Sequence, residues 1–509
     1  MLVTAHSYAL AGIAGVKIQV EVNLAFGIPA FDVVGLPDLA VKESRERVRA
    51  ALKNCGFAFP TERITVNLAP ADMKKEGPSF DLPIALGILA CKGLVPPSSL
   101  EDSAFIGELS LNGDVRSVRG ALALAISARE NGVGTLYLPE VNLPEVRCIE
   151  GIRIIPLKNL KQAADHLNGT EIIAPAQTIA YQTLLSEHSA LSDFAYVKGQ
   201  RSAKRALEIA AAGGHNVLMI GPPGSGKTLM ARCIPSILPS MSFDEALETT
   251  RIHSVSGSVP ETGLLTERPF RSPHHTASHV SLVGGGLHAA PGEISRAHNG
   301  VLFLDELPEY RRDVLEALRQ PMEDGFITIT RVGAQSTYPC NFMLVCSMNP
   351  CPCGNYGSRT QPCRCSQAEI RRYLNRVSGP LLDRVDMHIE VETINADRIA
   401  DLSTEEPSAA IRERVEQARN VQRERYAGEN IQCNARLDAR TLNRFCPMEP
   451  QARNILKMAS EQMGFSNRAY SRILKVARTI ADLAGSEMIL QAHVAEALRY
   501  RSTDKKYWS

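Results

Sequence analysis

The residues from Gly221 to Thr228 have the types and spacing that bind a phosphate chain. They follow an apolar run at Val217–Ile220 and precede a helical run at Leu229–Ile234. In such a loop the glycines let backbone N–H groups turn inward, Lys227 reaches the β- and γ-phosphates, and Thr228 offers its hydroxyl to Mg²⁺. The helix N-terminus adds a partial positive charge. The predicted nucleotide-binding residues are Gly221, Pro222, Pro223, Gly224, Ser225, Gly226, Lys227 and Thr228.

A pair of acids ends a second apolar run. Val301–Leu304 is typical of a buried parallel strand, and Asp305 and Glu306 follow it directly. The carboxyl ends of such strands are where an open α/β sheet holds its ligand. We therefore expect Asp305 to join Thr228 in the Mg²⁺ shell and Glu306 to polarise the attacking water. The pattern predicts hydrolysis of the bound phosphate chain as well as its binding.

Two further features lie on and after a third apolar run. This run, 342–348, ends in Asn349, whose amide could orient the water or contact the γ-phosphate. Two C-x-C pairs come next, and their four thiols could form a closed tetrahedral site for structural Zn²⁺. Free or redox-labile thiols are the alternative. The four cysteines are Cys351, Cys353, Cys363 and Cys365.

These side chains need a parallel sheet to position them, and the patterning of the chain predicts one. Strand-like and helical runs alternate in the first 165 residues and again from 193 to 394, as in α/β proteins. The remainder is helical in pattern. In the first block the expected strands are Lys17–Val22, Phe31–Val34, Ile64–Leu68 and Leu136–Leu138, and the expected helices are Leu39–Cys55, Leu82–Cys91 and Leu122–Asn131. The expected C-terminal helices are Ala409–Tyr426, Pro450–Met463, Arg468–Leu483 and Leu490–Tyr500.

Composition narrows the class of protein. The 509 residues are 44% hydrophobic and 22% charged, which excludes wholesale disorder. Lys and Arg number 56 against 55 Asp and Glu, so the net charge of +1 indicates no partner. No apolar run reaches membrane-spanning length, and the N-terminus lacks the basic region of a signal peptide. We therefore expect a cytoplasmic protein without a membrane partner.

The block 193–394 resembles the AAA+ ATPases, and within them the magnesium-chelatase-like branch. The resemblance implies that Asn349 is the sensor-1 residue and that Arg384, in Leu381-Leu-Asp-Arg-Val-Asp386, is the arginine finger. Arg468 matches the sensor-2 position, with Arg472 as the fallback. An arginine finger acts on the nucleotide of a neighbouring subunit, so the resemblance implies a ring, with six subunits expected.

In this branch, elements inserted into the core line the pore of the ring. The period-two run Phe326–Val332, followed by a turn at Gly333 and Ala334, predicts a β-hairpin in which Arg331 would contact DNA phosphates. The segment 268–294 resembles the helix-2 insertion of the branch. Its three histidines, His274, His275 and His279, are expected to pack in the ring interior or an interface rather than to bind metal, because no carboxylate or cysteine is close in sequence.

Residues 1–165 resemble the Lon-protease-like domain that precedes the ATPase core in ComM/YifB-type proteins. Ser79, in Lys75-Glu-Gly-Pro-Ser79-Phe-Asp-Leu-Pro83, falls on the nucleophilic serine. Aligned from Gly107–Val115, the catalytic lysine position falls on Leu122. Leucine cannot take the hydroxyl proton, so we expect the fold to be retained and proteolysis to be lost.

The whole chain resembles the ComM/YifB-type family. The expected domains are a Lon-like domain (1–165), a linker (166–192), an AAA+ core (193–394) and a helical lid (395–509). The resemblance implies a ring ATPase that uses ATP and Mg²⁺ to move on DNA, as in branch migration during recombination or natural transformation. Its protein partners are unknown. A motor for metal insertion or protein remodelling and an ATP-dependent protease are the alternatives; the chain has no D-x-S-x-S metal-adhesion motif.

Overall fold

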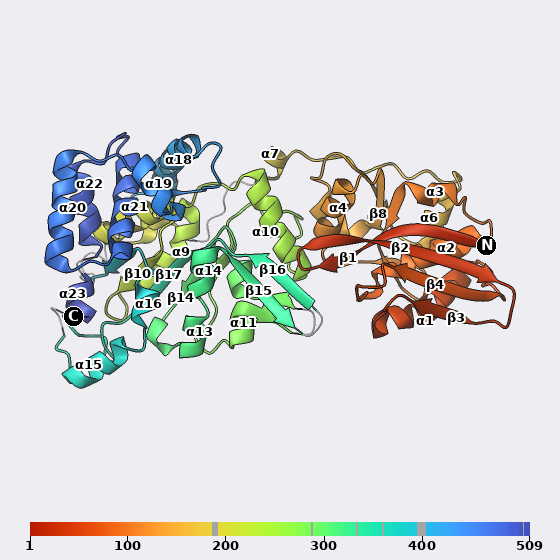
Figure 1. Cartoon of the computed structure of the whole chain (residues 1–509), viewed down its shortest axis with the longest axis horizontal. Coiled ribbons are helices and arrows are strands. Elements are labelled where there is room, and N and C mark those ends of the chain that lie inside the picture. Colours follow the sequence, from red (N-terminus) through yellow and green to blue (C-terminus); the bar gives the residue numbers. More distant parts are fainter. Residues whose placement is uncertain are drawn as a thin grey trace. The chain divides into compact units, whose positions relative to one another are not determined.

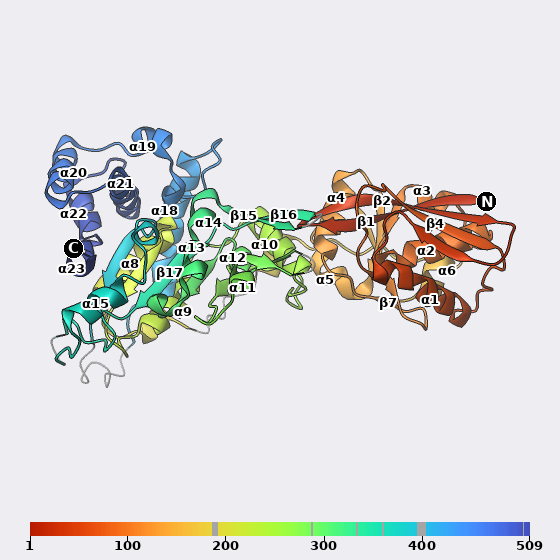
Figure 2. The same cartoon turned by 60° about the horizontal axis from the view of Figure 1, so that its bottom comes forward.

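The computed structural model describes residues 1–185, 192–286, 289–331, 334–358, 361–393, 404–501 and 503–508. The chain forms two compact units, each built from several stretches of sequence (Figures 1 and 2). Unit 1 contains Met1–Ser186, Phe243–Thr266 and Thr330–Tyr338, and unit 2 contains Glu187–Ser242, Glu267–Ile329 and Pro339–Ser509.

Unit 1 is built on a mixed seven-stranded sheet. Its strand order is β3-β4-β2-β1-β5-β8-β9, and β1 pairs antiparallel with β2 along its full length. Hydrophobic patterning did not predict β1, because its apolar and small residues do not alternate strictly. The strands are β1 (Leu2–Ala11), β2 (Ala14–Ala25), β3 (Phe31–Val34), β4 (Arg63–Ala69), β5 (Ser103–Phe105), β8 (Thr135–Pro139) and β9 (Arg153–Leu157). A small ribbon of β6 (Glu108–Leu109) and β7 (Val115–Arg116) lies apart from this sheet.

Helices complete the core of unit 1. Every residue of α2 is buried, and α2 packs against β1 and β2, which is why its sequence is apolar on all sides. The amphipathic α1 packs against α2 and buries Val41, Val48 and Leu52. The helices are α1 (Leu39–Asn54), α2 (Asp81–Cys91), α3 (Ser98–Glu101), α4 (Ala121–Glu130), α5 (Leu143–Val146), α6 (Leu160–Leu167), α7 (Tyr181–Leu184) and α10 (Phe243–Val255).

Helix α10 belongs to unit 1 although it follows the phosphate loop, Gly221–Thr228, in sequence. It packs against α4, and the amide of Gly120, which caps α4, donates to the carbonyl of Ser254 at 3.1 Å. The Ser254 hydroxyl donates to the buried Glu145 carboxylate at 2.6 Å. Arg251 donates to the carbonyl of Ile13 at 2.9 Å. Segment 243–266 is thereby held to the N-terminal residues by polar contacts as well as by packing.

Unit 2 contains a sheet of five parallel strands. Its order is β11-β14-β17-β10-β18, with β10 between β17 and β18. All four residues of β10 and all four of β14 are buried, as expected for strands covered on both faces. The strands are β10 (Val217–Ile220), β11 (Phe270–Arg271), β14 (Val301–Leu304), β17 (Met343–Met348) and β18 (Met387–Glu390).

The helices of unit 2 fall into a group around the sheet and a C-terminal group. The first group is α8 (Arg201–Gly213), α9 (Lys227–Ile237), α11 (His279–Val283), α12 (Glu293–Arg296), α13 (Arg312–Glu316), α14 (Arg319–Asp324), α15 (Gln367–Leu374) and α16 (Gly379–Leu382). The second is α18 (Ser408–Arg425), α19 (Ala439–Phe445), α20 (Pro450–Met463), α21 (Asn467–Leu483), α22 (Gln491–Arg499) and α23 (Thr503–Trp508).

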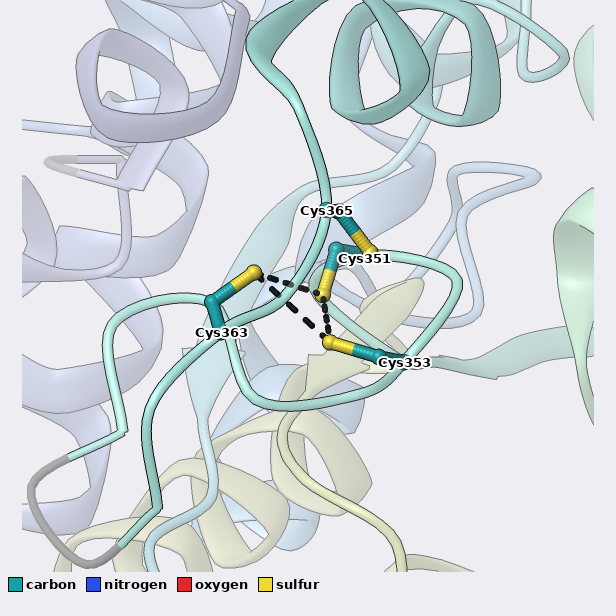
Figure 3. A group of neighbouring side chains, drawn as sticks. All are labelled: Cys351, Cys353, Cys363 and Cys365. Carbon is teal, nitrogen blue, oxygen red and sulfur yellow. Dashed lines mark hydrogen bonds between the residues drawn. The ribbon is translucent and has the colours of Figure 1, made fainter.

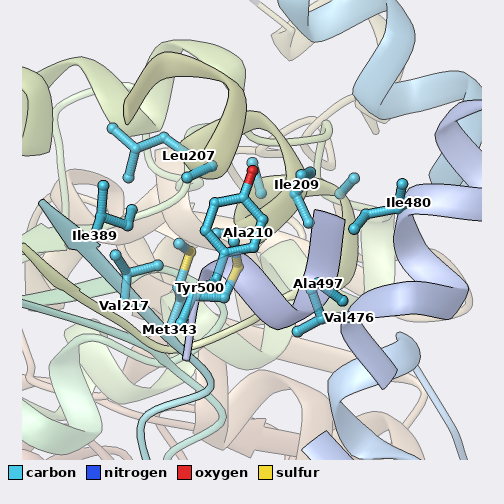
Figure 4. Packing of buried hydrophobic residues seen from close by; sticks show 14 of the residues in the cluster. Leu207, Ile209, Ala210, Val217, Met343, Ile389, Val476, Ile480, Ala497 and Tyr500 are labelled. Carbon is cyan, nitrogen blue, oxygen red and sulfur yellow. The ribbon is translucent and has the colours of Figure 1, made fainter. Parts of the chain in front are cut away.

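One hydrophobic core connects the sheet to the C-terminal helices. In Figure 4, Val217 of β10 and Ile389 of β18 lie at the left, and Ile480 of α21 lies at the right. Helix α8 contributes Ala210 between them. Helix α8 contacts both α18 and α21. The C-terminal helices therefore share a core with the unit 2 sheet and are stabilised by it.

Two short hairpins are also present. The strand β12 (Gly284–Gly285) pairs with β13 (Ala290–Pro291), and β15 (Phe326–Arg331) pairs with β16 (Ala334–Pro339). The second is the predicted hairpin. Its turn prediction was wrong at Ala334, which is the first residue of β16. Gly333 lies outside the described residues. No helix in the described part of the chain is both long and apolar enough to span a membrane.

Candidate functional site

The phosphate loop connects β10 to α9 at the carboxyl edge of the unit 2 sheet. Gly224 and Gly226 have φ values of 72° and 88°, which non-glycine residues rarely adopt. At Gly221 a Cβ would lie 2.3 Å from the carbonyl oxygen of Val391, so only glycine fits. Three glycines of the predicted eight-residue loop therefore lie where the backbone conformation or the close packing favours glycine.

Lys227 is the cation at the centre of the site. Its ammonium donates to the carbonyls of Gly221 at 2.7 Å and Pro222 at 2.8 Å, and to the Asn349 side-chain oxygen at 3.2 Å. Burial lowers the pKa of Lys227 to about 8, and the charges of Asp305 and Glu306 oppose this effect. An anionic phosphate near Lys227 would favour the charged form further.

Asp305 lies beside Thr228, as the sequence predicted for two ligands of one Mg²⁺. The Thr228 hydroxyl donates to Asp305 Oδ2 at 2.8 Å. Asp305 Oδ1 accepts from the Ser347 hydroxyl and, at 3.1 Å, from the amide of Glu306. Hydroxyl and carboxylate oxygens are the hard donors that Mg²⁺ prefers, so these residues fit the ion.

Ser347 is a site residue that the sequence analysis missed. It lies in β17, is 1% exposed, and aligns Asp305 from the neighbouring strand. Its hydroxyl also accepts from the Glu306 amide at 3.4 Å. The signal available in the sequence was a single hydroxyl in an otherwise apolar run, two residues before Asn349.

Glu306 adopts a left-handed backbone conformation, with φ of 53°, at the end of β14. Its carboxylate is half-exposed, and Oε2 lies 3.6 Å from Nδ1 of His275. His275 in turn contacts the rings of His274 and Tyr310. A polar cleft of about 420 Å³ adjoins Glu306. It is lined by Glu306, Glu309, Asn349, Pro352, Glu369, Arg372, Tyr373 and Arg376.

Arg384 lies at the opposite edge of the sheet from the phosphate loop. Its carbonyl accepts from Asn216, the residue that immediately precedes β10, whereas the loop immediately follows β10. A strand of four residues is about 13 Å long. The Arg384 guanidinium donates to the carbonyl of Pro380 and pairs with Glu323 at 2.8 Å.

The arginines of α21 also lie away from the phosphate loop contacts. Arg468 is exposed, and its guanidinium is 3.8 Å from Glu323, the partner of Arg384. Arg472 is mostly buried and lies 3.4 Å from Asp386, whose pKa is held below its usual range, against the effect of burial, by His215 and Arg472. Within the described residues, the structure thus brings together Lys227, Thr228, Asp305, Glu306 and Asn349, but neither Arg384 nor Arg468 pairs with them.

Three other groups of predicted residues have different outcomes. The four cysteines converge, with all four Sγ atoms within 4.8 Å of one another (Figure 3). Arg331 ends β15, but its side chain lies outside the described residues. The packing of His274, His275 and His279 in a ring interior or an interface stays a prediction.

The residues at the Lon-like dyad are arranged without a lysine at the matching position. Leu122 is wholly buried in α4, and Ser79 lies in the short 3₁₀ helix Pro78–Phe80. Lys75 is also buried, but its ammonium donates to the carbonyls of Pro70 and Met73. These contacts give Lys75 a role in holding its own loop.

Comparison with protein families accounts for most of the chain. Residues 193–399 match the family described as magnesium chelatase, subunit ChlI; residues 20–142 match subunit ChlI of Mg-chelatase; and residues 405–501 match the C-terminal part of that subunit. The three matches agree with a magnesium-chelatase-like ATPase with a helical C-terminal region.

Curated relatives extend over almost the full length. The chain is 44% identical to the competence protein ComM of Haemophilus influenzae, over 98% of this chain and 97% of that protein. It is 42% identical to the uncharacterized protein YifB of Escherichia coli, with the same coverage. A weaker likeness, 26% identity over 32% of this chain and 17% of that protein, is to the Lon protease of Mycoplasmopsis agalactiae. The chain therefore belongs to the ComM/YifB-type family of magnesium-chelatase-like AAA+ ATPases.

Proposed function

We propose that this protein is an ATP-hydrolysing ring motor that translocates on DNA, as a branch-migration or helicase enzyme of recombination or natural transformation. In the proposed domain division, residues 1–165 are the Lon-like domain, 166–192 the linker, 193–394 the ATPase core and 395–509 the lid. The proposed action on DNA is supported by one of the full-length relatives, which is a competence protein. The ring is expected to be a hexamer in the cytoplasm.

The nucleotide cycle follows from the contacts in unit 2. Lys227 binds the phosphate chain, and Glu306 polarises the attacking water from the carboxyl edge of the sheet. Asn349 holds the water or the γ-phosphate beside Lys227. Thr228 and Asp305 would hold Mg²⁺, which would neutralise phosphate charge.

The position of Arg384 is the observation that supports a ring assembly. It is joined to Asn216 at the amino end of β10, while its own phosphate loop follows the carboxyl end. An arginine on this edge is too far away to serve its own nucleotide, but it can serve that of the next subunit. Its present partner, Glu323, and the neighbouring Arg468 belong to the same surface.

A mixing experiment tests the ring directly. Glu306→Gln and Arg384→Ala should each lower hydrolysis strongly, yet a mixture of the two should regain part of it. In a mixed ring, some interfaces combine an intact Glu306 with an intact Arg384 from the neighbour. Arg311→Ala, at an exposed arginine paired with Asp313, is the matched control and should remain active alone. If no mixing ratio restores turnover, Arg384 does not act in trans.

Stimulation of ATP hydrolysis by DNA tests whether the motor moves on DNA. ATP hydrolysis should rise with single-stranded, duplex or four-way-junction DNA and should lose this stimulation as salt increases, because backbone contacts release counterions. The strongest activator identifies the preferred structure. Hydrolysis that is indifferent to every DNA would refute the DNA part and leave the ring ATPase.

A further inference from the structure

The four cysteines after Asn349 have the arrangement of a single-metal site. The Sγ atoms of Cys351 and Cys353 are 3.4 Å apart, those of Cys353 and Cys363 are 3.6 Å apart, and those of Cys351 and Cys363 are 3.7 Å apart. Sulfurs about 2.3 Å from a zinc ion form a tetrahedron with edges of about 3.8 Å. Cys365 completes the group, whose Sγ atoms all lie within 4.8 Å (Figure 3).

Donor chemistry selects the ion. Four thiolates at tetrahedral spacing favour Zn²⁺, which has no redox chemistry and no open position in such a site. An iron–sulfur cluster needs its cysteine sulfurs further apart, because several iron and sulfide atoms lie between them. In the described part of the chain, this is the only group of three or more His, Cys, Asp or Glu side chains arranged to hold a metal.

The cysteine loop contacts the nucleotide site at two points. Cys351 follows Asn349 by two residues, so its coordination fixes the backbone that carries the Asn349 amide. Gly354, with φ of 80°, packs directly on the phosphate loop, where a Cβ would lie 2.4 Å from Cδ of Pro223. Pro352 lines the cleft beside Glu306 and Asn349.

Helix α15 supports the same residues from the other end of the loop. It begins just after Cys365, with a capping box between Ser366 and Glu369. Its Tyr373 is buried, which raises the pKa of the phenol to about 12, an effect that the nearby backbone of Asn349 opposes. Tyr373 and Asn349 line the same cleft. The second cysteine pair is thus coupled through α15 to the residue that follows β17.

We propose that Cys351, Cys353, Cys363 and Cys365 bind one structural Zn²⁺, and that the zinc-bound loop positions Asn349 and Pro223 for ATP hydrolysis. The second half rests on the proposed ATPase function; the first half does not. The loop is a positioning element, because its cysteines act on the reaction only through Asn349 and Pro223.

Metal content tests the site itself. Protein purified under reducing conditions should contain about one zinc per chain, and cobalt reconstitution should produce the thiolate-to-cobalt charge-transfer band of a tetrahedral site. Cys363→Ser should lose both signals, whereas Cys363→His should keep the metal because imidazole is also a zinc ligand. Cys55→Ser, at a free thiol outside the group, is the control. Absence of zinc together with absence of the cobalt band overturns the proposal.

Kinetics test the positioning role. Cys363→Ser should lower kcat by about 10- to 100-fold, the range for disturbed outer-shell contacts, with a smaller change in ATP affinity. Cys363→His should restore most of kcat. Gly354→Ala should retain zinc but impair ATP binding or turnover through Pro223. Normal kinetics in both zinc-free Cys363→Ser and Gly354→Ala would refute the positioning role.

A readout independent of hydrolysis separates this proposal from the proposed function. Trp508, the chain's one tryptophan, contacts Tyr507, which contacts Tyr356 inside the cysteine loop. Zinc removal should therefore change Trp508 fluorescence and weaken binding of a fluorescent ATP analogue. If zinc is bound and its removal has both effects while no ATP is hydrolysed, the ATPase function fails and the coupling stands. If zinc removal has neither effect, the coupling fails.

Discussion

Ser347→Ala should weaken the response of the ATPase to Mg²⁺. The Ser347 hydroxyl donates to Asp305 Oδ1, while Thr228 occupies Oδ2 at 2.8 Å. Without Ser347, Oδ1 keeps only the Glu306 amide at 3.1 Å, so Asp305 can rotate away from its orientation beside Thr228. Loss of an outer-shell partner of a metal ligand weakens metal binding by about 10- to 100-fold, equivalent to roughly 1.4–2.7 kcal/mol.

The assay is ATP hydrolysis titrated with Mg²⁺. The Mg²⁺ concentration for half-maximal activity should rise by about 10- to 100-fold in Ser347→Ala. The kcat at saturating Mg²⁺ should largely recover. Loss of a buried hydrogen bond to a charged acceptor should also lower the free energy of unfolding by about 1.5–3 kcal/mol.

Ser295→Ala is the matched control. Ser295 is also a fully buried serine of unit 2, but its hydroxyl has no hydrogen-bond partner among the described residues. Its removal should leave the Mg²⁺ response unchanged and should be neutral or slightly stabilising. The reasoning is refuted if Ser347→Ala keeps the wild-type Mg²⁺ titration, or if both variants shift it equally.

Three further predictions concern other charged groups. Glu306→Gln should bind ATP yet lower kcat by about 10²–10⁴-fold, the contribution of a general base, as single-turnover hydrolysis would measure; near-normal turnover would remove Glu306 from this role. Burial lowers the pKa of Lys227 to about 8, so the free protein loses this positive charge above pH 8, and ATP affinity should fall by up to about tenfold per pH unit there. A fluorescent ATP analogue measures this, and Lys227→Ala should show weak binding without the pH 8 step. Burial raises the pKa of Glu145 above its ordinary value. The folded state therefore binds its proton more tightly, and stability is fully present below the ordinary pKa and falls as pH rises through the folded pKa. Glu145→Gln keeps an acceptor for Ser254 and should raise Tm at pH 8 more than at pH 5; equal shifts at both pH values would contradict this account.

Elements with a strong local signal could be predicted from the sequence to the residue. Phe31–Val34, Val217–Ile220, Val301–Leu304 and Pro450–Met463 are confirmed with the predicted bounds. Each is either a short apolar strand next to turn or ligand residues, or a helix with proline at its first turn and glycine after its end. The fold class is confirmed for the same reason, since repeated strand–helix alternation predicts an α/β protein.

Other elements had no comparable local signal. The strand Leu2–Ala11 mixes small, polar and apolar residues, and it is specified by its pairing with β2 rather than by its own periodicity. The helix Arg201–Gly213 was not predicted separately, because its apolar stripe consists mostly of alanine, which is only weakly hydrophobic. Helices α18 and α21 pack on it.

The residues of the candidate nucleotide site could be predicted from local sequence spacing. The glycines, Lys227, Thr228 and Asp305 are close to their partners because each directly follows a strand of one parallel sheet, so local spacing is sufficient to predict them. The family resemblance drawn from these motifs is confirmed over almost the whole chain.

Which residues from distant parts of the chain meet depends on the tertiary structure. It brought Ser347 to Asp305 from the neighbouring strand. It joined Arg384 to the amino end of β10, and it packed the segment 243–266 with the N-terminal residues. These arrangements depend on strand order and on packing between elements far apart in the chain, which hydrophobic periodicity and local spacing do not encode.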